Sequence, residues 1–287
     1  MIPSNFEYVR ANSVKDAISL LSQHGDGAKL LAGGHSLIPA MKFRLSTPST
    51  LIDVSGIGEL SEIKMSGDKI EIGAFATHRA VEHSDVINKE CGVLAEAAGK
   101  IGDPQVRNRG TIGGSLAHAD PAADYPALVL ALNADIHVEG KSGSRTIIAD
   151  DFFTELFETA LKDDEMITKV SFPLVGKGTG AAYEKFPHPA SRFAVVGVAV
   201  VVTVDGGKCT AARVGVTGAA ASPFRATDVE NALTGKALDE QTISDATAKV
   251  AEPADLLNDL IASAEYRAHL CSVMAKRALM TAAARAK

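Results

Sequence analysis

Two glycine pairs, Gly33-Gly34 and Gly113-Gly114, have the clearest potential for chemistry in this chain. Glycine allows positive φ angles and lets bare backbone N–H groups converge on an anion without a Cβ atom in the way. Each pair follows an apolar or extended run and precedes an expected helix, whose N-terminus would add favourable partial positive charge. Two such loops could together hold the two phosphates of a dinucleotide. Taken singly, each pair is explained more simply as a tight structural turn.

Two charged residues, Asp124 and Lys185, could complete such a site. Asp120 and Asp124 lie four residues apart, before and within the first turn of an expected helix, where carboxylates suit the helix dipole. Helix capping accounts for Asp120, whereas Asp124 could accept hydrogen bonds from a ribityl or ribose hydroxyl. Lys185 is flanked by aromatic residues and could neutralise a phosphate or a reduced flavin, although an ordinary snorkelling lysine explains it equally well.

Other catalytic signatures are missing from the sequence. Neither glycine pair belongs to a GxGxxG motif and no Walker lysine follows, which argues against a nicotinamide-binding domain and against a nucleoside triphosphatase. The eight histidines show no HxxxH or HxH spacing, and no GxSxG motif anchors a hydrolase triad. Cys91, Cys209 and Cys271 form no CxxC pair, so we expect buried, reduced thiols. We therefore assign no catalytic residue and no metal ligand.

Composition narrows the class of protein further. The 287 residues are 46% hydrophobic and 22% charged, which is enough for a large core without disulfides or a metal. The formal charge of −6 makes a nucleic acid a poor partner. The N-terminal residues lack the features of a signal peptide, and the longest apolar stretch, 193–204, is too short to span a bilayer. We expect a cytoplasmic protein that is not an integral membrane protein.

The helices and strands that must position these residues are mixed along the sequence, which predicts an α+β protein in two parts. An apolar strand at 29–32 runs into the first glycine pair, and Ser36 could cap the helix that follows. A hairpin is expected over 194–216, and a helix follows Asp120-Pro121. The Gly/Pro cluster 173–180 is the best domain boundary in the chain.

A last helix is expected at 264–284. Five residues near helical spacing predict a stripe that packs on the core. The stripe consists of Tyr266, Leu270, Val273, Arg277 and Met280.

Two long motifs, about 80 residues apart and in the right order, resemble the flavin loops of the FAD-binding medium subunits of molybdenum hydroxylases. The first runs over 31–45 and contains Ala-Gly-Gly-His-Ser, and the second runs over 107–124 and contains Thr-Ile-Gly-Gly-Ser. The likeness covers essentially the whole chain and is strongest to the carbon monoxide dehydrogenase branch, which shares His35 where many members have glutamine. Ser115 stands where many members have asparagine, and Phe193 stands where that branch has a flavin-side tyrosine.

The resemblance implies a fold and a cofactor. Residues 1–176 would form an FAD-binding domain of the vanillyl-alcohol-oxidase (PCMH) type, with lobes of about 1–54 and 55–176. Residues 177–287 would form a smaller α/β C-terminal domain of the CO dehydrogenase flavoprotein type. FAD would be bound non-covalently between the lobes. By match of motif, the cofactor-binding residues would be Ala32, Gly33, Gly34, His35, Ser36, Ile101, Thr111, Ile112, Gly113, Gly114, Ser115, Asp124, Ile167 and Lys185.

The resemblance also implies partners. A small subunit with two [2Fe-2S] clusters and a large subunit with a molybdopterin cofactor would complete the complex, as a dimer of heterotrimers. Substrate would be oxidised at molybdenum, and this chain would pass electrons from the [2Fe-2S] clusters to a quinone, another acceptor or oxygen. Carbon monoxide is the first expectation for the substrate, with N-heterocycles, purines and aldehydes close behind. The complex could lie at the inner face of the membrane.

Two other functions stay open on the residues alone. A stand-alone FAD-dependent oxidase or dehydrogenase would have its own substrate pocket and would turn over without other chains. An interaction module would have kept the fold and lost the cofactor, although the two intact glycine pairs argue against it.

Overall fold

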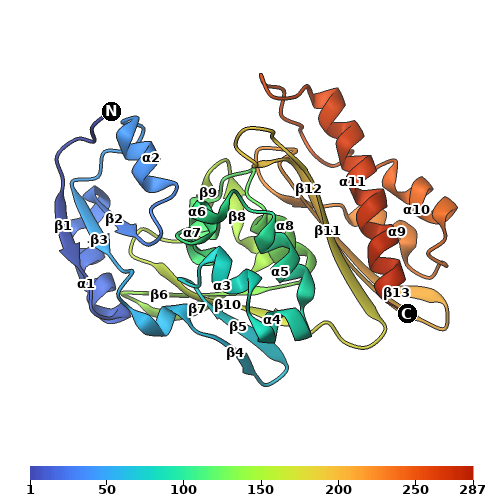
Figure 1. Ribbon diagram of the computed structural model, residues 1–287, viewed down its shortest axis with the longest axis horizontal. Helices are drawn as coiled ribbons and strands as arrows, with labels where there is room; N and C mark the ends of the chain where they lie inside the picture. Colours follow the sequence, from blue (N-terminus) through green and yellow to red (C-terminus); the bar gives the residue numbers. More distant parts are fainter. Residues whose placement is uncertain (287) are drawn as a thin grey trace.

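The computed structural model describes residues 1–286, which form three units side by side along the longest axis of the molecule (Figure 1). The first unit, the N-terminal lobe, is a three-stranded parallel sheet with two helices. Its strands, in order across the sheet, are β1 (Glu7–Arg10), β3 (Thr50–Asp53) and β2 (Ala28–Leu31). Helix α1 (Val14–His24) begins where the Ser13 side chain accepts a hydrogen bond from the Asp16 amide. Helix α2 (Leu37–Lys42) follows the first glycine pair.

The middle lobe is built on a five-stranded antiparallel sheet. Its strands, in order, are β4 (Ile63–Ser66), β5 (Lys69–Gly73), β10 (Met166–Pro173), β6 (Asp135–Gly140) and β7 (Gly143–Ile148). A small hairpin is made by β8 (Phe153–Glu155) and β9 (Glu158–Thr159). The helices of this lobe are α3 (His78–Glu82), α4 (Asp85–Glu90), α5 (Gly92–Gly99), α6 (Pro104–Arg107), α7 (Ile112–His118) and α8 (Tyr125–Ala131).

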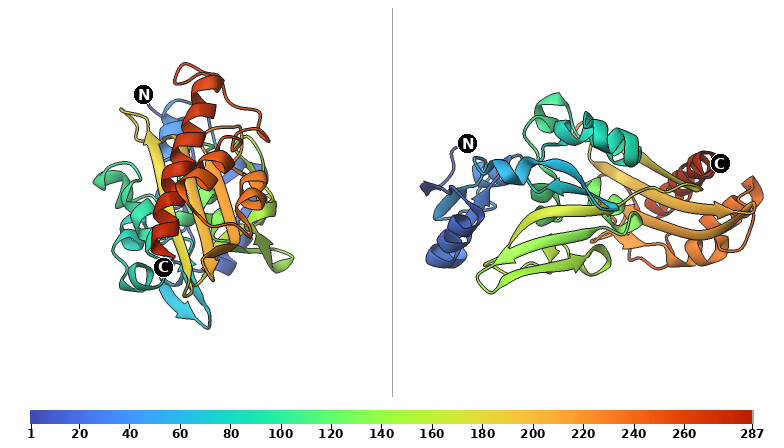
Figure 2. Two further views of the ribbon diagram at one scale, coloured as in Figure 1. Left: turned by 90° about the vertical axis from the view of Figure 1, so that its right-hand side faces the viewer. Right: turned by 90° about the horizontal axis from the view of Figure 1, so that it is seen from below.

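The C-terminal domain is a four-stranded antiparallel sheet with three helices. Its strands are β11 (Thr179–Pro187), β12 (Ala194–Asp205), β13 (Lys208–Thr217) and β14 (Phe224–Arg225). Its helices are α9 (Thr227–Leu233), α10 (Glu240–Thr247) and α11 (Ala264–Arg285). Helix α11 lies along β11 and β12, as the left view of Figure 2 shows, while α8 of the middle lobe packs on β12 and β13.

The C-terminal sheet is buried on both faces. Side chains of β11 and β12 alternate between two cores: Tyr183 and Ala199 belong to the core of the middle lobe, and Ala182 and Val198 to the core of the C-terminal domain. This alternation follows from the two-residue period of a strand. The C-terminal sheet therefore packs directly on the middle lobe, where α8 covers β12 and β13.

Helix α11 has a different buried face from the one that the sequence predicts. Of the expected stripe only Leu270 is buried, whereas Tyr266 and Met280 are exposed large hydrophobic residues. The buried side is rich in small residues, because the helix comes so close to β11 that a Cβ atom on Gly180 would overlap the Ala282 carbonyl. Its members are Arg267, Leu270, Cys271, Met274, Ala275, Ala278, Leu279 and Ala282.

The α+β class in two parts and the 194–216 hairpin are confirmed, while strand β11 was not expected. The boundary at 176/177 stays a prediction; β10 ends at Pro173 and β11 begins at Thr179. All three cysteines are buried, and burial raises the pKa of Cys91 and of Cys271 to about 12. No helix within residues 1–286 is both long and apolar enough to cross a membrane.

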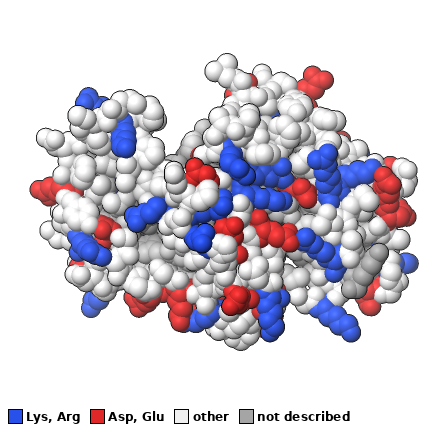
Figure 3. Space-filling view, viewed as in Figure 1, with Lys and Arg blue, Asp and Glu red and all other residues white. Residues whose placement is uncertain are grey.

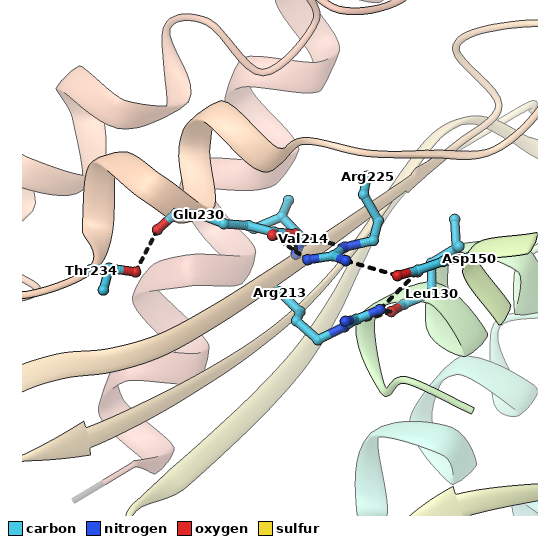
Figure 4. Close-up of polar contacts among 7 residues, drawn as sticks. All are labelled: Leu130, Asp150, Arg213, Val214, Arg225, Glu230 and Thr234. Atoms are coloured by element: carbon cyan, nitrogen blue, oxygen red, sulfur yellow. Dashed lines mark hydrogen bonds and ion pairs between the residues drawn. The ribbon is translucent and has the colours of Figure 1, made fainter. Parts of the chain in front are cut away.

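An ionic cluster joins the C-terminal domain to the middle lobe (Figure 4). Arg213 and Arg225 contact the Asp150 carboxylate at 2.8 and 2.9 Å. Arg213 also donates to the Leu130 carbonyl near the end of α8, and Arg225 pairs with Glu230 of α9. The Asp150 side chain is 32% exposed. We therefore expect its ion pairs to stabilise the fold more than a fully solvated pair does and less than a buried one.

We expect Asp150→Ala to lower the free energy of unfolding by about 1–2 kcal/mol, because two arginine side chains lose a shared partner. Urea unfolding followed by circular dichroism measures the change. The matched control is Asp151→Ala, since the neighbouring Asp151 side chain is exposed. Equal losses in the two variants would contradict a stabilising role for the cluster.

Candidate functional site

The two glycine loops come together between the N-terminal and middle lobes. A Cβ atom on Gly33 would overlap the backbone carbonyl of Arg109, which belongs to the segment that leads into the second loop. Only glycine permits this approach of two backbones. Residues Gly33 and Thr111 line one cleft. The structure thus places both predicted loops at one site, as two loops that share a ligand require.

The first loop offers a run of unpaired backbone donors. Within residues 1–286, no acceptor bonds to the backbone N–H groups of 33–36, whereas the Ile38 amide donates to the Gly34 carbonyl. Gly34 has a φ of +74°, in the left-handed region. Successive amides around a left-handed residue are the arrangement by which backbone binds anions. Ser36 makes no cap bond to α2, so the predicted cap is wrong.

The second loop bonds its amides within the protein. Thr111 accepts from the Gly114 amide at 3.1 Å and starts α7. The other amides donate to backbone carbonyls at 2.8–3.1 Å: Ile112 to Ala76, Gly113 to Ala74 and Ser115 to Thr111. This loop is therefore held in a fixed shape, and the free backbone donors at the site come from the first loop.

The two apolar members of the predicted set lie in the middle lobe. Ile167 is buried in β10, and the carbonyl of the next residue, Thr168, accepts from the Ala74 amide at 3.0 Å. Since Ala74 also accepts from Gly113, β10 is connected to the second loop through one residue. Ile101 is half-buried, and its carbonyl accepts from Arg107 at 3.1 Å.

A cleft of about 160 Å³ lies where the loops meet, and Figure 3 shows the surface hollowed between the two lobes on the face viewed. Its lining combines loop backbone with hydroxyl groups and one guanidinium. The lining residues are Ala32, Gly33, Ser55, Ser61, Phe75, Thr77, Asn108, Arg109 and Thr111. Arg109 is exposed, and no carboxylate in the described part of the chain pairs with it, so its charge is available to an anion.

Asp124 and Lys185 form a buried ion pair. The Lys185 ammonium lies 2.8 Å from the Asp124 carboxylate, and the two side chains are 3% and 4% exposed. Tyr183 donates to the same carboxylate at 2.6 Å. Burial raises the pKa of Asp124, and Lys185 and then Tyr183 oppose the rise. The predicted place of Asp124 inside the first turn of a helix is wrong, because it precedes α8 and makes no cap bond.

Two histidines flank the loops. His35 is exposed, with Nε2 3.3 Å from the Gln105 carbonyl. His78 is buried, and burial lowers its pKa to about 4. Its Nδ1 atom and the Tyr125 hydroxyl have no hydrogen-bond partner in the described structure, and the two rings lie 5.4 Å apart. The His78 backbone N–H donates to the Gly110 carbonyl at 2.9 Å, so this histidine also holds the segment that leads into the second loop.

The site supplies hydrogen-bond donors and a cation to an anion, and comparison with known families identifies the class of cofactor. Residues 4–175 match the family described as the FAD binding domain in molybdopterin dehydrogenase. The chain belongs to this family of FAD-binding subunits. Residues 181–282 match the CO dehydrogenase flavoprotein C-terminal domain. The protein is a flavoprotein subunit of the molybdenum-containing oxidoreductases, as the resemblance of its motifs implied.

Relatives of this FAD-binding subunit match it over its full length. The carbon monoxide dehydrogenase medium chain of Afipia carboxidovorans is 40% identical, over all of both chains. The 6-hydroxypseudooxynicotine dehydrogenase complex subunit alpha of Paenarthrobacter nicotinovorans is 38% identical over 100% of this chain and 97% of its own. A solved structure of carbon monoxide dehydrogenase from Hydrogenophaga pseudoflava, lacking the Mo-pyranopterin moiety, superposes with a TM-score of 0.96 at 42% identity, covering 99% of each chain.

Sequence reasoning missed several residues of the FAD-binding subunit's cleft. Ser55, Ser61 and Thr77 lie outside both glycine motifs and carry no local signal. Arg109 stands inside the second motif, and its charge beside a phosphate-type loop was the signal that could have found it. The roles of the fourteen predicted cofactor-binding residues stay predictions.

We expect Gly33→Ala to destabilise the FAD-binding subunit by about 1–3 kcal/mol, because the new methyl group forces two backbones apart. Urea unfolding measures the loss. Gly58→Ala is the matched control, since a Cβ atom there has no neighbour within 4 Å. A Gly33→Ala protein as stable as this control would show that the loop contact is not tight.

We expect His78 to make stability depend on pH. The buried ring stays neutral down to about pH 4, whereas an unfolded histidine takes up a proton near pH 6.5. The unfolded state therefore binds more protons between these values, and the stabilising effect is complete above pH 6.5 and lost as the pH falls to 4. Between pH 6.5 and pH 4, the free energy of unfolding of the wild type should fall by up to about 3 kcal/mol more than that of His78→Phe.

The control for this pH series is the exposed His83, replaced by phenylalanine. Its pH profile should follow that of the wild type. A His78→Phe profile parallel to the wild type would mean that His78 takes up its proton at the same pH in the folded and unfolded states, which would contradict the lowered pKa.

Proposed function

We propose that this FAD-binding subunit is the electron-transfer flavoprotein of a carbon monoxide dehydrogenase-like molybdenum hydroxylase. It would take electrons from the [2Fe-2S] clusters of a partner subunit and pass them to an external acceptor. The observation that carries the proposal is the run of unpaired amides at 33–36, held against Arg109 at the edge of the cleft.

The residues at the cleft fit the diphosphate of FAD. The free amides of the first loop and the Arg109 guanidinium would hold its diphosphate, because both supply donors without needing an acceptor in return. Thr111 and Thr77 also line the cleft and carry hydroxyl groups. When bound, FAD supplies one- and two-electron transfer, and the chain's task is to hold and orient it. Asp124 and Lys185 would lie next to its polar chain and ring as a pre-paired acceptor and cation.

The substrate and partners follow from the relatives rather than from the cleft. Two full-length relatives at 40% and 41% identity are carbon monoxide dehydrogenase medium chains, which supports carbon monoxide as the reducing substrate. A relative at 38% belongs to a complex with a different substrate in its name, so the substrate would be chosen by another subunit. We assign the [2Fe-2S] clusters to a small subunit and the molybdopterin cofactor to a large one, in a cytoplasmic dimer of heterotrimers that delivers electrons to a quinone or another acceptor.

The test is purification of the native complex. We expect two companion chains, iron, molybdenum and one FAD per copy of this chain, and carbon monoxide should bleach the flavin absorption. Acid precipitation should release the FAD into the supernatant, because the flavin is bound non-covalently. A complex without iron or molybdenum would overturn the proposal, and so would reduction of the flavin by a substrate on this chain alone. Yellow colour retained by the precipitate would contradict non-covalent binding.

A further inference from the structure

The C-terminal domain holds the segment that carries Asp124. The Ala194 amide donates to the Ala122 carbonyl at 3.0 Å, and the Gly218 amide donates to the Pro121 carbonyl at 2.7 Å. The buried Thr217 hydroxyl lies 2.8 Å from the Pro121 carbonyl and 2.7 Å from that of Ala123. Three successive carbonyls before Asp124 are thus bonded to β12, to β13 and to the residue that follows β13. The backbone position of Asp124 is therefore set from the other domain.

The Asp124 side chain is held from the same direction. Both of its partners, Tyr183 and Lys185, lie on β11, and their side chains reach the carboxylate at 2.6 and 2.8 Å. Tyr183 is 1% exposed, so its hydroxyl can bond to little besides Asp124. Lys185 has a second acceptor, the Lys100 carbonyl at 3.1 Å. Tyr183 is thus the partner committed to Asp124 alone.

Two further features keep the Tyr183 ring in place. Gly197, opposite Lys185 on β12, provides the room for the hydroxyl, which a Cβ atom at this position would overlap. The Lys100 ammonium lies 5.5 Å from the ring centroid and donates to the Tyr183 carbonyl at 2.6 Å. Because both the ring and its backbone are fixed, the hydroxyl can hold the carboxylate in one orientation.

We propose that Tyr183 is a positioning residue for FAD binding: from the C-terminal domain, its hydroxyl orients the Asp124 carboxylate. The inference rests on the proposed function, since it assigns the Asp124 carboxylate to FAD. It goes beyond the two loops, because the FAD affinity of one domain is made to depend on a side chain of the other.

Removal of the Tyr183 hydroxyl should change both the orientation of the Asp124 carboxylate and the pH at which it takes up a proton. The groups that face the Asp124 carboxylate are Lys185 and Tyr183 from β11 and Lys100, which follows α5. Burial raises the pKa of Asp124, and the Tyr183 hydroxyl is one of the groups that opposes this. Without it the carboxyl should take up a proton at a higher pH, so the pH below which FAD binding weakens should move upward.

The experiment is an FAD titration of the purified complex after its flavin has been removed. In Tyr183→Phe we expect the Kd for FAD to rise about tenfold at pH 7.5, as for the loss of one hydrogen bond to a charged group. The matched control is Tyr125→Phe, a buried tyrosine whose hydroxyl has no partner in the described structure, and it should bind FAD as the wild type does. The pH profile of the Kd should shift upward in Tyr183→Phe only.

A double substitution separates positioning from general stability. If Tyr183 acts through Asp124, Tyr183→Phe should add no further loss of FAD affinity to Asp124→Asn. Additive losses, or a Tyr183→Phe complex that binds FAD like the control, would overturn the inference. If Tyr183→Phe does not fold, Gly197→Ala displaces the same hydroxyl and should raise the Kd in the same way, and an unchanged Kd would overturn the inference. A wild-type complex that binds no FAD would instead refute the proposed function.

Discussion

The contact between the Gly33 backbone and the Arg109 carbonyl is the constraint on which the site depends. It fixes the N-terminal lobe against the middle lobe at a distance that no side chain could occupy. Because the first loop turns through a left-handed Gly34 at this contact, its next amides have no partner in the described part of the protein. The free donors therefore lie in the same tight turn that brings the two lobes into contact.

The two glycine loops differ in how their backbone amides are used. The second loop, bonded to Ala74, Ala76 and its own Thr111, is a rigid wall, while the first loop supplies the open donors. The rigid wall is continuous with β10, which crosses the centre of the middle sheet. Beyond it, the C-terminal sheet belongs to two cores at once and reaches back to the segment before Asp124. The three units seen in Figure 1 are thus joined into one framework.

The sequence predicted the parts of this site that depend on local chemistry. The glycine pairs and the hairpin of β12 and β13 are each specified by neighbouring residues, and the structure has them where they were expected. Contacts between segments distant in the sequence could not be predicted from local patterns. The pairing of Asp124 with Tyr183 spans 59 residues, and no local pattern announces it.

The error at helix α11 has a related cause. An apolar stripe at helical spacing predicts burial only if the partner surface accepts large side chains. The C-terminal sheet, with Gly180 against Ala282, instead accepts a face of alanines and leaves Tyr266 and Met280 outside. The distance between α11 and the sheet is set by Gly180 on strand β11. The sequence of the helix alone therefore does not predict which of its faces is buried.

The buried cysteines have a consequence for a protein that handles electrons. Reduced flavins in contact with oxygen generate peroxide, and peroxide attacks the thiolate rather than the neutral thiol. With pKa values raised to about 12, Cys91 and Cys271 stay protonated at neutral pH and lie out of reach of solvent. Burial and a raised pKa therefore both disfavour sulfenic acid formation at these two positions.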